Sequence, residues 1–361
     1  MSRSKDKLIK IVGAGPSGLT AAINLVRAGY KVDVYEKRSD TGKRFHGDLQ
    51  GLENWSDDED VLEQLGRMNV DINFDADPFL KLIITNGQGQ RVSHYDRPLC
   101  YLVKRGDVEG SLDQGLKRQA LQAGVDIHFR QTIPLEEADI VATGPISREL
   151  FAVDKGIVFK TDYEDTNVFL LNDKAAYKGY SYLLITKGYG CMCTVLFDRF
   201  PDLDQNFEVA RQILEEMFDF DIREPQPVAG VGCFSTKNIY QKGQALYVGE
   251  AAGLQDLMWG FGIKTAVESG YMAAESIIHD RDFAAMARAR FQPKLKATLV
   301  DRFVWEILRY KDYRAVVGDG LSAQTRRSFD LGFLYNFSLL HRLVYPLALL
   351  AMRRRYPNLR I

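Results

Sequence analysis

Cysteine is scarce in this sequence, and the spacing of the few cysteines matches neither a disulfide scaffold nor a metal site. Among 361 residues the only cysteines are Cys100, Cys191, Cys193 and Cys233. This number excludes a disulfide-dense scaffold. The segment Cys191–Cys193 has one residue between its thiols, so it is not a CxxC redox pair, and no further metal ligands are evident nearby. We therefore expect reduced cysteines, with Cys191 and Cys193 as small buried apolar side chains, and no metal site.

An excess of one charge and a long apolar run are also missing. The formal net charge is -1, which argues against nucleic-acid binding because such binding needs a basic field over one face. No apolar targeting segment precedes the first predicted strand at Lys7. The uncharged apolar run Leu343–Met352 is about ten residues long, whereas a transmembrane helix needs about twenty. With few cysteines, these absences favour a cytoplasmic protein, with the inner face of the membrane as a further expected location.

Glycine, by contrast, is placed where a dinucleotide needs it. An apolar strand from residue 7 leads into Gly13-x-Gly15-x-x-Gly18 and then an alanine-rich helix, with Pro16 and Ser17 in the turn. In this motif Gly13 permits the tight turn, Gly15 lets the backbone approach a pyrophosphate, and Gly18 lets the helix pack on the strand. The helix N-terminus then faces the phosphates. The spacing predicts a Rossmann-type dinucleotide site.

A second strand supports this prediction. The segment Lys31–Tyr35 follows the helix and ends at Glu36, with Lys37 next. A carboxylate at this position accepts hydrogen bonds from ribose hydroxyls. Glu36 also argues against a cofactor with a 2′-phosphate, because two negative charges would meet.

The domain organisation is predicted to be discontinuous, because elements typical of the dinucleotide half return late in the chain. We expect an α/β fold in which a Rossmann-type dinucleotide-binding domain is interleaved with a mixed or antiparallel substrate sheet, followed by C-terminal helices. The length and the 46% hydrophobic content suit this size. The predicted parts are 1–75, 98–150 and 240–280 for the first domain, 76–97 and 151–239 for the second, and 281–361 for the helices.

Several local patterns fill in these parts. Residues 37–60 have no clear period and predict a long functional loop. Two apolar runs, 81–85 and 91–95, flank a turn that contains Asn86-Gly87 and predict a hairpin. Helices are expected over 107–123 and about 206–218.

Four separated motifs together resemble the FAD-binding fold of the para-hydroxybenzoate hydroxylase type. They are the first glycine motif with Glu36, the strand end at Arg105, the turn 142–144, and Gly249-Glu250 followed by the glycines of 260–263. In that fold the first motif holds the ADP part and the late acid contacts the ribityl chain, although here Glu250 stands where the family usually has Asp. The resemblance implies FAD contacts from Gly13, Gly15, Pro16, Ser17, Gly18, Glu36, Lys37, Arg44, Gly47, Arg105, Thr143, Gly144, Gly249, Glu250, Gly262 and Ile263.

Within this superfamily the chain looks most like the geranylgeranyl reductases, which saturate isolated double bonds of prenyl chains. The segment 180–190 resembles that family's Tyr-x-Trp-x-Phe-Pro followed by Gly-x-Gly, and residues 45–48 resemble its Cys-Gly-Asp. Four positions depart from the pattern. Tyr182 replaces Trp, Ile185-Thr186 replaces Phe-Pro, and His46 replaces the Cys that the family places close to the flavin.

This resemblance implies hydride transfer from reduced flavin to an alkene, together with a proton from a nearby acid. His46 is the candidate proton donor because its ordinary pKa of about 6.5 suits transfer near neutrality. Tyr180, Tyr182, Trp259 and Phe261 are the candidate substrate-lining residues. The alternatives are a loop histidine bonded to backbone, a core role for one of the tyrosines, and packing under a loop for Trp259 and Phe261. For Arg105 the alternative is a solvated strand end.

A second nucleotide-binding motif is missing. Gly230-Val-Gly232 lacks the third glycine and a following helix, so a separate nicotinamide domain is not expected. The electron donor must therefore dock transiently, and NAD(P)H, a ferredoxin and a quinol all remain open.

The C-terminal region contains no acidic residue after Asp330. Its aromatic segment 333–337 and apolar segment 343–352 predict a pair of interfacial helices on anionic lipid. The alternative is a helix packed on the substrate domain with a solvated basic end. The basic residues of this region are Arg342, Arg353, Arg354, Arg355 and Arg360.

The sequence thus predicts an FAD-dependent oxidoreductase that reduces C=C bonds of a prenyl lipid or a similar apolar substrate. Two alternatives remain. One is an FAD-dependent monooxygenase or halogenase, although the halogenase Trp-x-Trp-x-Ile-Pro signature is missing. The other is a non-catalytic prenyl-binding escort, against which the retained glycines and Glu36 argue.

Overall fold

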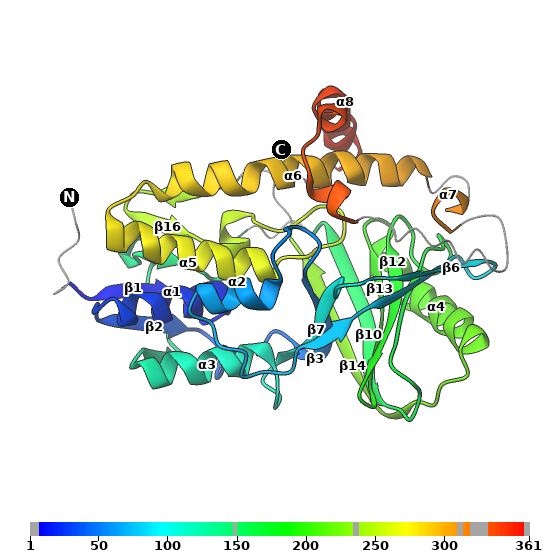
Figure 1. The fold of residues 1–361 in the computed structure, drawn as a ribbon, viewed down its shortest axis with the longest axis horizontal. Helices are drawn as coiled ribbons and strands as arrows, with labels where there is room; N and C mark the ends of the chain where they lie inside the picture. Colours follow the sequence, from blue (N-terminus) through cyan, green and yellow to red (C-terminus); the bar gives the residue numbers. More distant parts are fainter. Residues whose placement is uncertain (1–6, 147–149, 234–237, 309–312, 318–330, 357–361) are drawn as a thin grey trace.

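The protein is built from two large sheets that lie side by side, with helices over the first and C-terminal helices across the top of both (Figure 1). The structure is a computed structural model, and it describes residues 7–146, 150–233, 238–308, 313–317 and 331–356. The core is correspondingly divided, because one large apolar cluster lies in the first half and a second lies between the second sheet and the C-terminal helices.

The first sheet is the Rossmann sheet, with strand order β15-β16-β9-β1-β2-β8. All neighbours run parallel except β15 and β16, which form an antiparallel pair. Its strands come from distant parts of the chain, so this half is discontinuous. They are β1 (Ile9–Val12), β2 (Val32–Glu36), β8 (Asp126–Phe129), β9 (Ile140–Val141), β15 (Gln241–Lys242) and β16 (Ala245–Tyr247).

Helices pack on this sheet at close range. Helix α1 (Pro16–Arg27) contacts α3 (Leu112–Ala123) and α5 (Ile263–His279), while α2 (Val61–Arg67) begins at the N-cap Asp60. The helix predicted over 107–123 begins only at residue 112. The reason is local, because the Ser111 hydroxyl accepts from the Gln114 N–H at 3.2 Å and so starts the helix there.

The second sheet has seven strands in the order β14-β10-β13-β12-β11-β5-β6. It is mixed, because β11 runs parallel to β5 while the other neighbours are antiparallel. The predicted hairpin is confirmed as β5 and β6, and helix α4 (Leu203–Met217) confirms the expected helix on this sheet. The strands are β5 (Lys81–Thr85), β6 (Gln90–His94), β10 (Ala152–Lys160), β11 (Thr166–Leu170), β12 (Tyr180–Thr186), β13 (Tyr189–Leu196) and β14 (Arg223–Gly232).

A small third sheet joins the two halves and corrects one prediction. Strand β3 (His46–Glu53) pairs with β7 (Cys100–Gly106), which also pairs with β4 (Asp77–Phe79). The loop predicted over 37–60 is therefore wrong for 46–53. The two glycines of β3 hide its period, and both make room for aromatic rings, since a Cβ on Gly51 would lie 2.7 Å from the Phe261 ring.

The C-terminal part of the chain is helical, as expected. It comprises α6 (Phe283–Leu308), α7 (Arg314–Val317), the 3-10 turn η5 (Leu331–Tyr335) and α8 (Leu339–Arg355). Helix α6 runs along the top of both halves, and α8 lies on α6 (Figure 1). The predicted pair of helices is thus one short 3-10 turn, which takes in 333–335, and one helix. Among the described helices, none combines the length and apolar character needed to cross a bilayer.

The shorter turns are η1 (Leu135–Glu137), η2 (Phe200–Asp202) and η3 (Gly249–Ala252). All four cysteines are free. Cys191 and Cys193 are buried as predicted, and Cys100 is buried as well. Within the described ranges, no three His, Cys, Asp or Glu side chains are grouped so that they could hold a metal ion.

Candidate functional site

The first glycine turn forms an open cradle in front of α1. A Cβ on Gly13, whose φ is +105°, would lie 2.2 Å from the Ala142 carbonyl oxygen, and one on Gly18 would lie 2.0 Å from the Gly13 oxygen. A Cβ on Gly15 would meet nothing within 4 Å. Gly15 is also the N-cap of α1, where no side chain accepts from the helix N–H groups. The turn therefore presents helix N–H groups to free space, which is the arrangement that binds a phosphate.

Glu36 lies beside this turn at the end of β2. Its carboxylate accepts from the Ala14 N–H at 3.0 Å and from the Arg38 N–H at 2.8 Å, and the side chain is half-buried. Each carboxylate oxygen keeps lone-pair capacity for another donor. This geometry fits the two hydroxyls of a ribose. Lys37 next to it is exposed to solvent.

Residues from three further segments meet at the carboxyl edge of the Rossmann sheet. Arg44 forms an ion pair with Glu250, and its Nη2 donates to the Val231 carbonyl oxygen at 2.8 Å. A Cβ on Gly144, whose φ is +78°, would lie 3.5 Å from Glu250 Oε2, which places the turn of Thr143 beside the pair. Both charged side chains remain partly exposed. These groups therefore form a polar cluster, partly open to solvent, at this edge of the sheet.

The N-terminal end of α1 packs against the middle of α5 here, since a Cβ on Gly270 would lie 2.1 Å from the Ser17 carbonyl oxygen. The Gly249 N–H donates to the Ser269 hydroxyl at 2.9 Å, and a Cβ on Gly249 would lie 2.8 Å from the Ser17 hydroxyl. Gly262 is the N-cap of α5 and Ile263 its first residue. The N-terminus of α1 points toward this edge of the sheet, where negative charge is favoured.

Arg105 is buried rather than solvated, which makes the solvated-strand-end alternative wrong. Its Nε and Nη2 donate to Asp113 at 2.9 and 3.1 Å, and Nη1 donates to Gln50 at 3.1 Å. The guanidinium carbon lies 4.4 Å from the centre of the Phe45 ring. Arg105 therefore positions the segment that carries Arg44 and His46, through a buried bidentate pair.

His46 begins β3 and is exposed to solvent. Its backbone N–H donates to Asp48 at 3.0 Å, and its side chain is close enough to Asp107 to contribute to the lowered pKa of that carboxyl, after the hydrogen bond from Lys43. The next residue, Gly47, accepts from the Tyr189 hydroxyl at 2.9 Å. The role of His46 as a proton donor stays a prediction.

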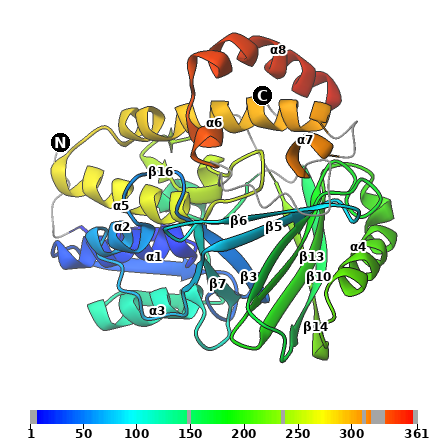
Figure 2. The same cartoon turned by 45° about the vertical axis from the view of Figure 1, so that its right-hand side comes forward.

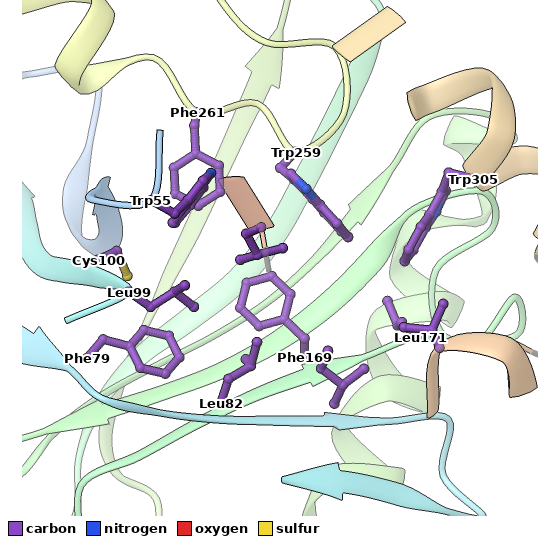
Figure 3. Close-up of a pocket in the computed structure, with 13 residues that line it drawn as sticks. Trp55, Phe79, Leu82, Leu99, Cys100, Phe169, Leu171, Trp259, Phe261 and Trp305 are labelled. Atoms are coloured by element: carbon purple, nitrogen blue, oxygen red, sulfur yellow. The ribbon is translucent and has the colours of Figure 1, made fainter. Parts of the chain in front are cut away.

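An aromatic cavity lies between the second sheet, the small sheet and the segment that leads into α5 (Figure 3). About 570 Å³ of space lies between its atoms, with the solvent at its open mouth included. Its wall is apolar apart from indole nitrogens and one thiol. The lining residues are Trp55, Phe79, Leu82, Ile84, Leu99, Cys100, Phe169, Leu171, Trp259, Phe261, Trp305, Val316 and Leu331.

Edge-to-face contacts hold one side of this cavity. The Trp55 and Phe261 rings lie 4.7 Å apart at 88°, and the Trp259 and Trp305 rings lie 4.8 Å apart at 71°. Figure 3 shows Phe261, Trp259 and Trp305 on one side and Phe79, Leu82 and Leu171 on the other. Such pairs restrain ring positions and keep the space between the walls open.

Two of the four predicted substrate-lining residues, Trp259 and Phe261, line this cavity, whereas Tyr180 and Tyr182 do not. The Tyr180 hydroxyl donates to the Trp259 carbonyl oxygen, and its ring lies 5.4 Å from the Trp259 ring. Burial raises the pKa of Tyr180 far above its usual value. Tyr180 therefore supports Trp259 from behind. The ring of Tyr182 lies 6.3 Å from the ring of Tyr180.

The sequence prediction missed most of the cavity. Trp55, Phe79, Phe169 and Trp305 are scattered over four segments and share no period. Only Trp55 carried a signal, as a large apolar residue in the polar stretch 37–60.

Buried acids lie behind the Trp259 side of the cavity. Asp256 Oδ1 accepts from the backbone N–H groups of Met258 and Trp259 at 2.9 and 2.7 Å, which shapes the loop that carries Trp259. Burial raises the pKa of Asp256 to about 6. Burial, with the charge of Asp256, raises the pKa of Asp301 to about 8. Within the described residues, Glu53 Oε2 and Asp301 Oδ2 have no hydrogen-bond partner.

Residues 11–49 match the model of the NAD(P)-binding Rossmann-like domain family. A lysine-specific histone demethylase 1 homolog 3 from Arabidopsis thaliana is 31% identical over 121 residues, which cover 32% of this chain. The match spans only 7% of the length of that protein.

Solved structures are similar over nearly the whole chain. A geranylgeranyl bacteriochlorophyll reductase-like protein from Thermoplasma acidophilum has a TM-score of 0.64 at 18% identity, covering 97% of this chain and 98% of that one. A flavin-dependent brominase has a TM-score of 0.65 at 16% identity, covering 97% and 100%. CtdE, solved with FAD and a substrate, has a TM-score of 0.59 at 13% identity, covering 95% and 99%.

These likenesses show the fold. The chain shares the α/β fold of these structures, with a Rossmann sheet, a mixed second sheet and C-terminal helices. The predicted fold class is therefore confirmed.

Proposed function

We propose that this protein is an FAD-dependent oxidoreductase that reduces isolated C=C bonds of a prenyl lipid or a similarly apolar substrate. The observation that carries the proposal is the aromatic cavity, because it adjoins the segment that leads from η3 into α5. Its thirteen lining residues include no charged side chain. A polar substrate would lose its hydration there without compensating hydrogen bonds.

The residues of the Rossmann half fit FAD. The open cradle at Gly15 would hold the pyrophosphate and Glu36 would accept from the ribose. Arg44 and Glu250, which meet beside Gly144, would separate or turn to admit the middle of the cofactor. When bound and reduced, a flavin supplies hydride chemistry that side chains lack.

The side chains of the protein position the substrate and exclude water from it. The rings of Trp259, Phe261 and Trp55 would hold an alkene in place while excluding water, which lowers the entropic part of the barrier. Reduction also needs a proton. His46 is the candidate from the sequence, and the buried acids behind Trp259 are a second source on the cavity side of the protein.

The electron donor is proposed to dock transiently. The described part of the chain contains one Rossmann sheet, and the second glycine pair lies in β14 rather than in a strand-to-helix turn. NAD(P)H, a ferredoxin and a quinol are each compatible with this arrangement.

The test begins with the purified protein. We expect a flavin absorption spectrum and, after organic extraction, a polyprenyl compound by mass spectrometry. Photoreduced protein incubated anaerobically with a prenyl lipid is then expected to yield a product with two additional hydrogen atoms per bond reduced.

Three outcomes would contradict the proposal. An oxygen-dependent hydroxylated product would indicate a monooxygenase, and a halide-dependent one a halogenase. A colourless protein that takes up no FAD yet retains a prenyl lipid would indicate a non-catalytic escort.

A further inference from the structure

Helix α8 presents leucines to solvent along one face. Figure 2 shows this helix as the outermost layer over α6. At about 100° of rotation per residue, the exposed leucines fall within an arc of roughly 100°. Their exposed fractions are 74% for Leu339, 60% for Leu340, 72% for Leu343, 60% for Leu347 and 50% for Leu350.

The opposite face of α8 is already packed. His341, Ala348 and Met352 are at most 2% exposed, and the latter two belong to the apolar cluster under the C-terminal helices. His341 Nε2 lies 3.1 Å from Asp301 on α6. The helix is therefore apolar on two sides, and folding of this chain uses only one of them. Five neighbouring exposed leucines form a patch of the kind that marks an interaction site.

Positive charge accompanies this leucine face. Arg342, Arg353 and Arg354 are exposed, and residues 331–361 contain no Asp or Glu. Arg355, in contrast, donates to Glu306 of α6 at 2.8 Å. Arg360 lies outside the described residues. The face thus combines apolar side chains with cationic ones, which is the composition of helices that lie in a membrane interface.

We propose that α8 docks flat on an anionic lipid bilayer, with its leucines at the boundary between headgroups and acyl chains. A span across the bilayer is excluded for α8, because it has 17 residues and three arginines at its end. A second copy of this chain fits less well. A symmetric α8 contact would bring the arginines of both copies together, and residues 331–361 offer no acid to neutralise them.

Docking would also bring the cavity toward the lipid. Leu331 of η5 and Trp305 of α6 line the cavity, and both elements adjoin each other under α8. This link rests on the proposed function, since it gives an apolar substrate a short route from the bilayer. The docking itself rests only on the surface of α8.

The experiment is vesicle flotation with the full chain. Vesicles of phosphatidylcholine alone are compared with vesicles in which about a third of the lipid is phosphatidylglycerol. We expect binding to the anionic vesicles, with the bound fraction falling as salt rises, because charge contributes to the attraction. The double variant Leu343→Glu, Leu347→Glu is expected to lower the partition coefficient at least about tenfold.

A matched control tests whether an added surface charge lowers binding only when it lies on the leucine face of α8. Leu121 on α3 is 50% exposed, so Leu121→Glu adds a charge at a half-exposed leucine away from α8. It is expected to float like the wild type. Arg342→Gln with Arg354→Gln should reduce the preference for anionic vesicles. Thermal melts of each variant verify the fold.

The proposal is overturned if the wild type floats with neither vesicle. It is also overturned if the wild type is a dimer by light scattering and the leucine variants are monomers, because the face would then pair two copies. Flavin content and turnover of a detergent-dispersed substrate are measured in parallel. A wild-type protein without flavin and without turnover would contradict the proposed function. The result of the vesicle-binding experiment would not be affected.

Discussion

The Rossmann half and the cavity half of this molecule build their sites in different ways. In the first, backbone atoms form the site, since Gly13, Gly15 and Gly18 shape a turn at the N-terminal end of α1. In the second, side chains do it, since aromatic rings from several distant segments form one wall. A site made of backbone is determined over a short stretch of chain, whereas a site made of rings depends on the packing of the whole domain.

The two halves also differ in how the carboxylate oxygens of their buried acids are paired. In the first half, Asp139 is 6% exposed and accepts from Lys7 Nζ at 3.1 Å and from the Lys10 N–H at 3.0 Å. In the second, Asp301 is 7% exposed and has an oxygen with no partner among the described residues. The first carboxylate is part of a satisfied structure. The second is kept protonated more easily, which is a property that proton transfer can use.

The largest effect is expected where backbone meets backbone. Gly18→Val would place a Cβ 2.0 Å from the Gly13 oxygen and 3.1 Å from Ala142 Cβ, and neither the backbone nor a packed methyl can move away easily. We expect the free energy of unfolding to fall by at least about 3 kcal/mol, measured by urea denaturation. Gly66→Ala in α2, where a Cβ meets nothing, is the control and should be neutral or slightly stabilising. A well-folded Gly18→Val protein would contradict the close-packing role.

Gly15→Val separates cofactor binding from folding. A Cβ there meets no protein atom and the backbone is extended, so stability of the apoprotein should change by less than about 1 kcal/mol. The same side chain would fill the cradle. We expect the Kd for FAD to rise at least about tenfold, or about 1.4 kcal/mol, in a fluorescence titration of the apoprotein. Unchanged affinity would mean that the cofactor does not lie at this turn.

The cavity half is tested by filling it. Ile84→Trp would occupy part of the aromatic cavity while leaving the glycine turn untouched. We expect the flavin spectrum to be retained and turnover of an apolar substrate to fall at least about tenfold, since a one-ångström misplacement can cost about a hundredfold in rate. Ile84→Val is the control, because it does not narrow the space. Equal loss in both variants would point to destabilisation instead of blockage.

The smallest effect is expected at Asp301. Its pKa of about 8 in the folded protein lies above the ordinary value, so the unfolded chain releases this proton first as pH rises. The contribution to stability is therefore present below about pH 4 and is lost as pH rises to about 8. Asp301→Asn should flatten this decline, raising Tm near pH 8 by roughly a few degrees relative to wild type.

Differential scanning calorimetry between pH 5 and 8 measures this difference. Asp204→Asn is the control, because the Asp204 side chain is 83% exposed. A wild-type profile in Asp301→Asn would show that this carboxyl carries no raised pKa.

The sequence was sufficient for the elements whose signals are local. The turn from Gly13 to Gly18, the end of β2 at Glu36 and the β5–β6 hairpin follow from glycine spacing and alternation. Strand β3 could not be predicted, because Gly47 and Gly51 interrupt its alternation to admit Tyr189 and Phe261, which are far away in the chain.

The site shows the same division. The glycines of the cradle were predicted by number, since their backbone requirement is independent of the rest of the fold. The direction in which the Tyr180 side chain points depends on the strands that flank β12 and on a hydrogen bond to Trp259, 79 residues away in the chain. The residue pattern of β12 alone therefore could not predict that direction.

By itself, the sequence determined a Rossmann turn, an acid at the end of the second strand and a second half built on strands, because each follows from conformational preferences within a few residues. Only the tertiary structure decided which rings form the cavity, that Arg105 pairs with Asp113, and that the leucines of α8 face solvent. These depend on register and packing between segments far apart in the chain, and they are settled only when the two halves and the C-terminal helices come together.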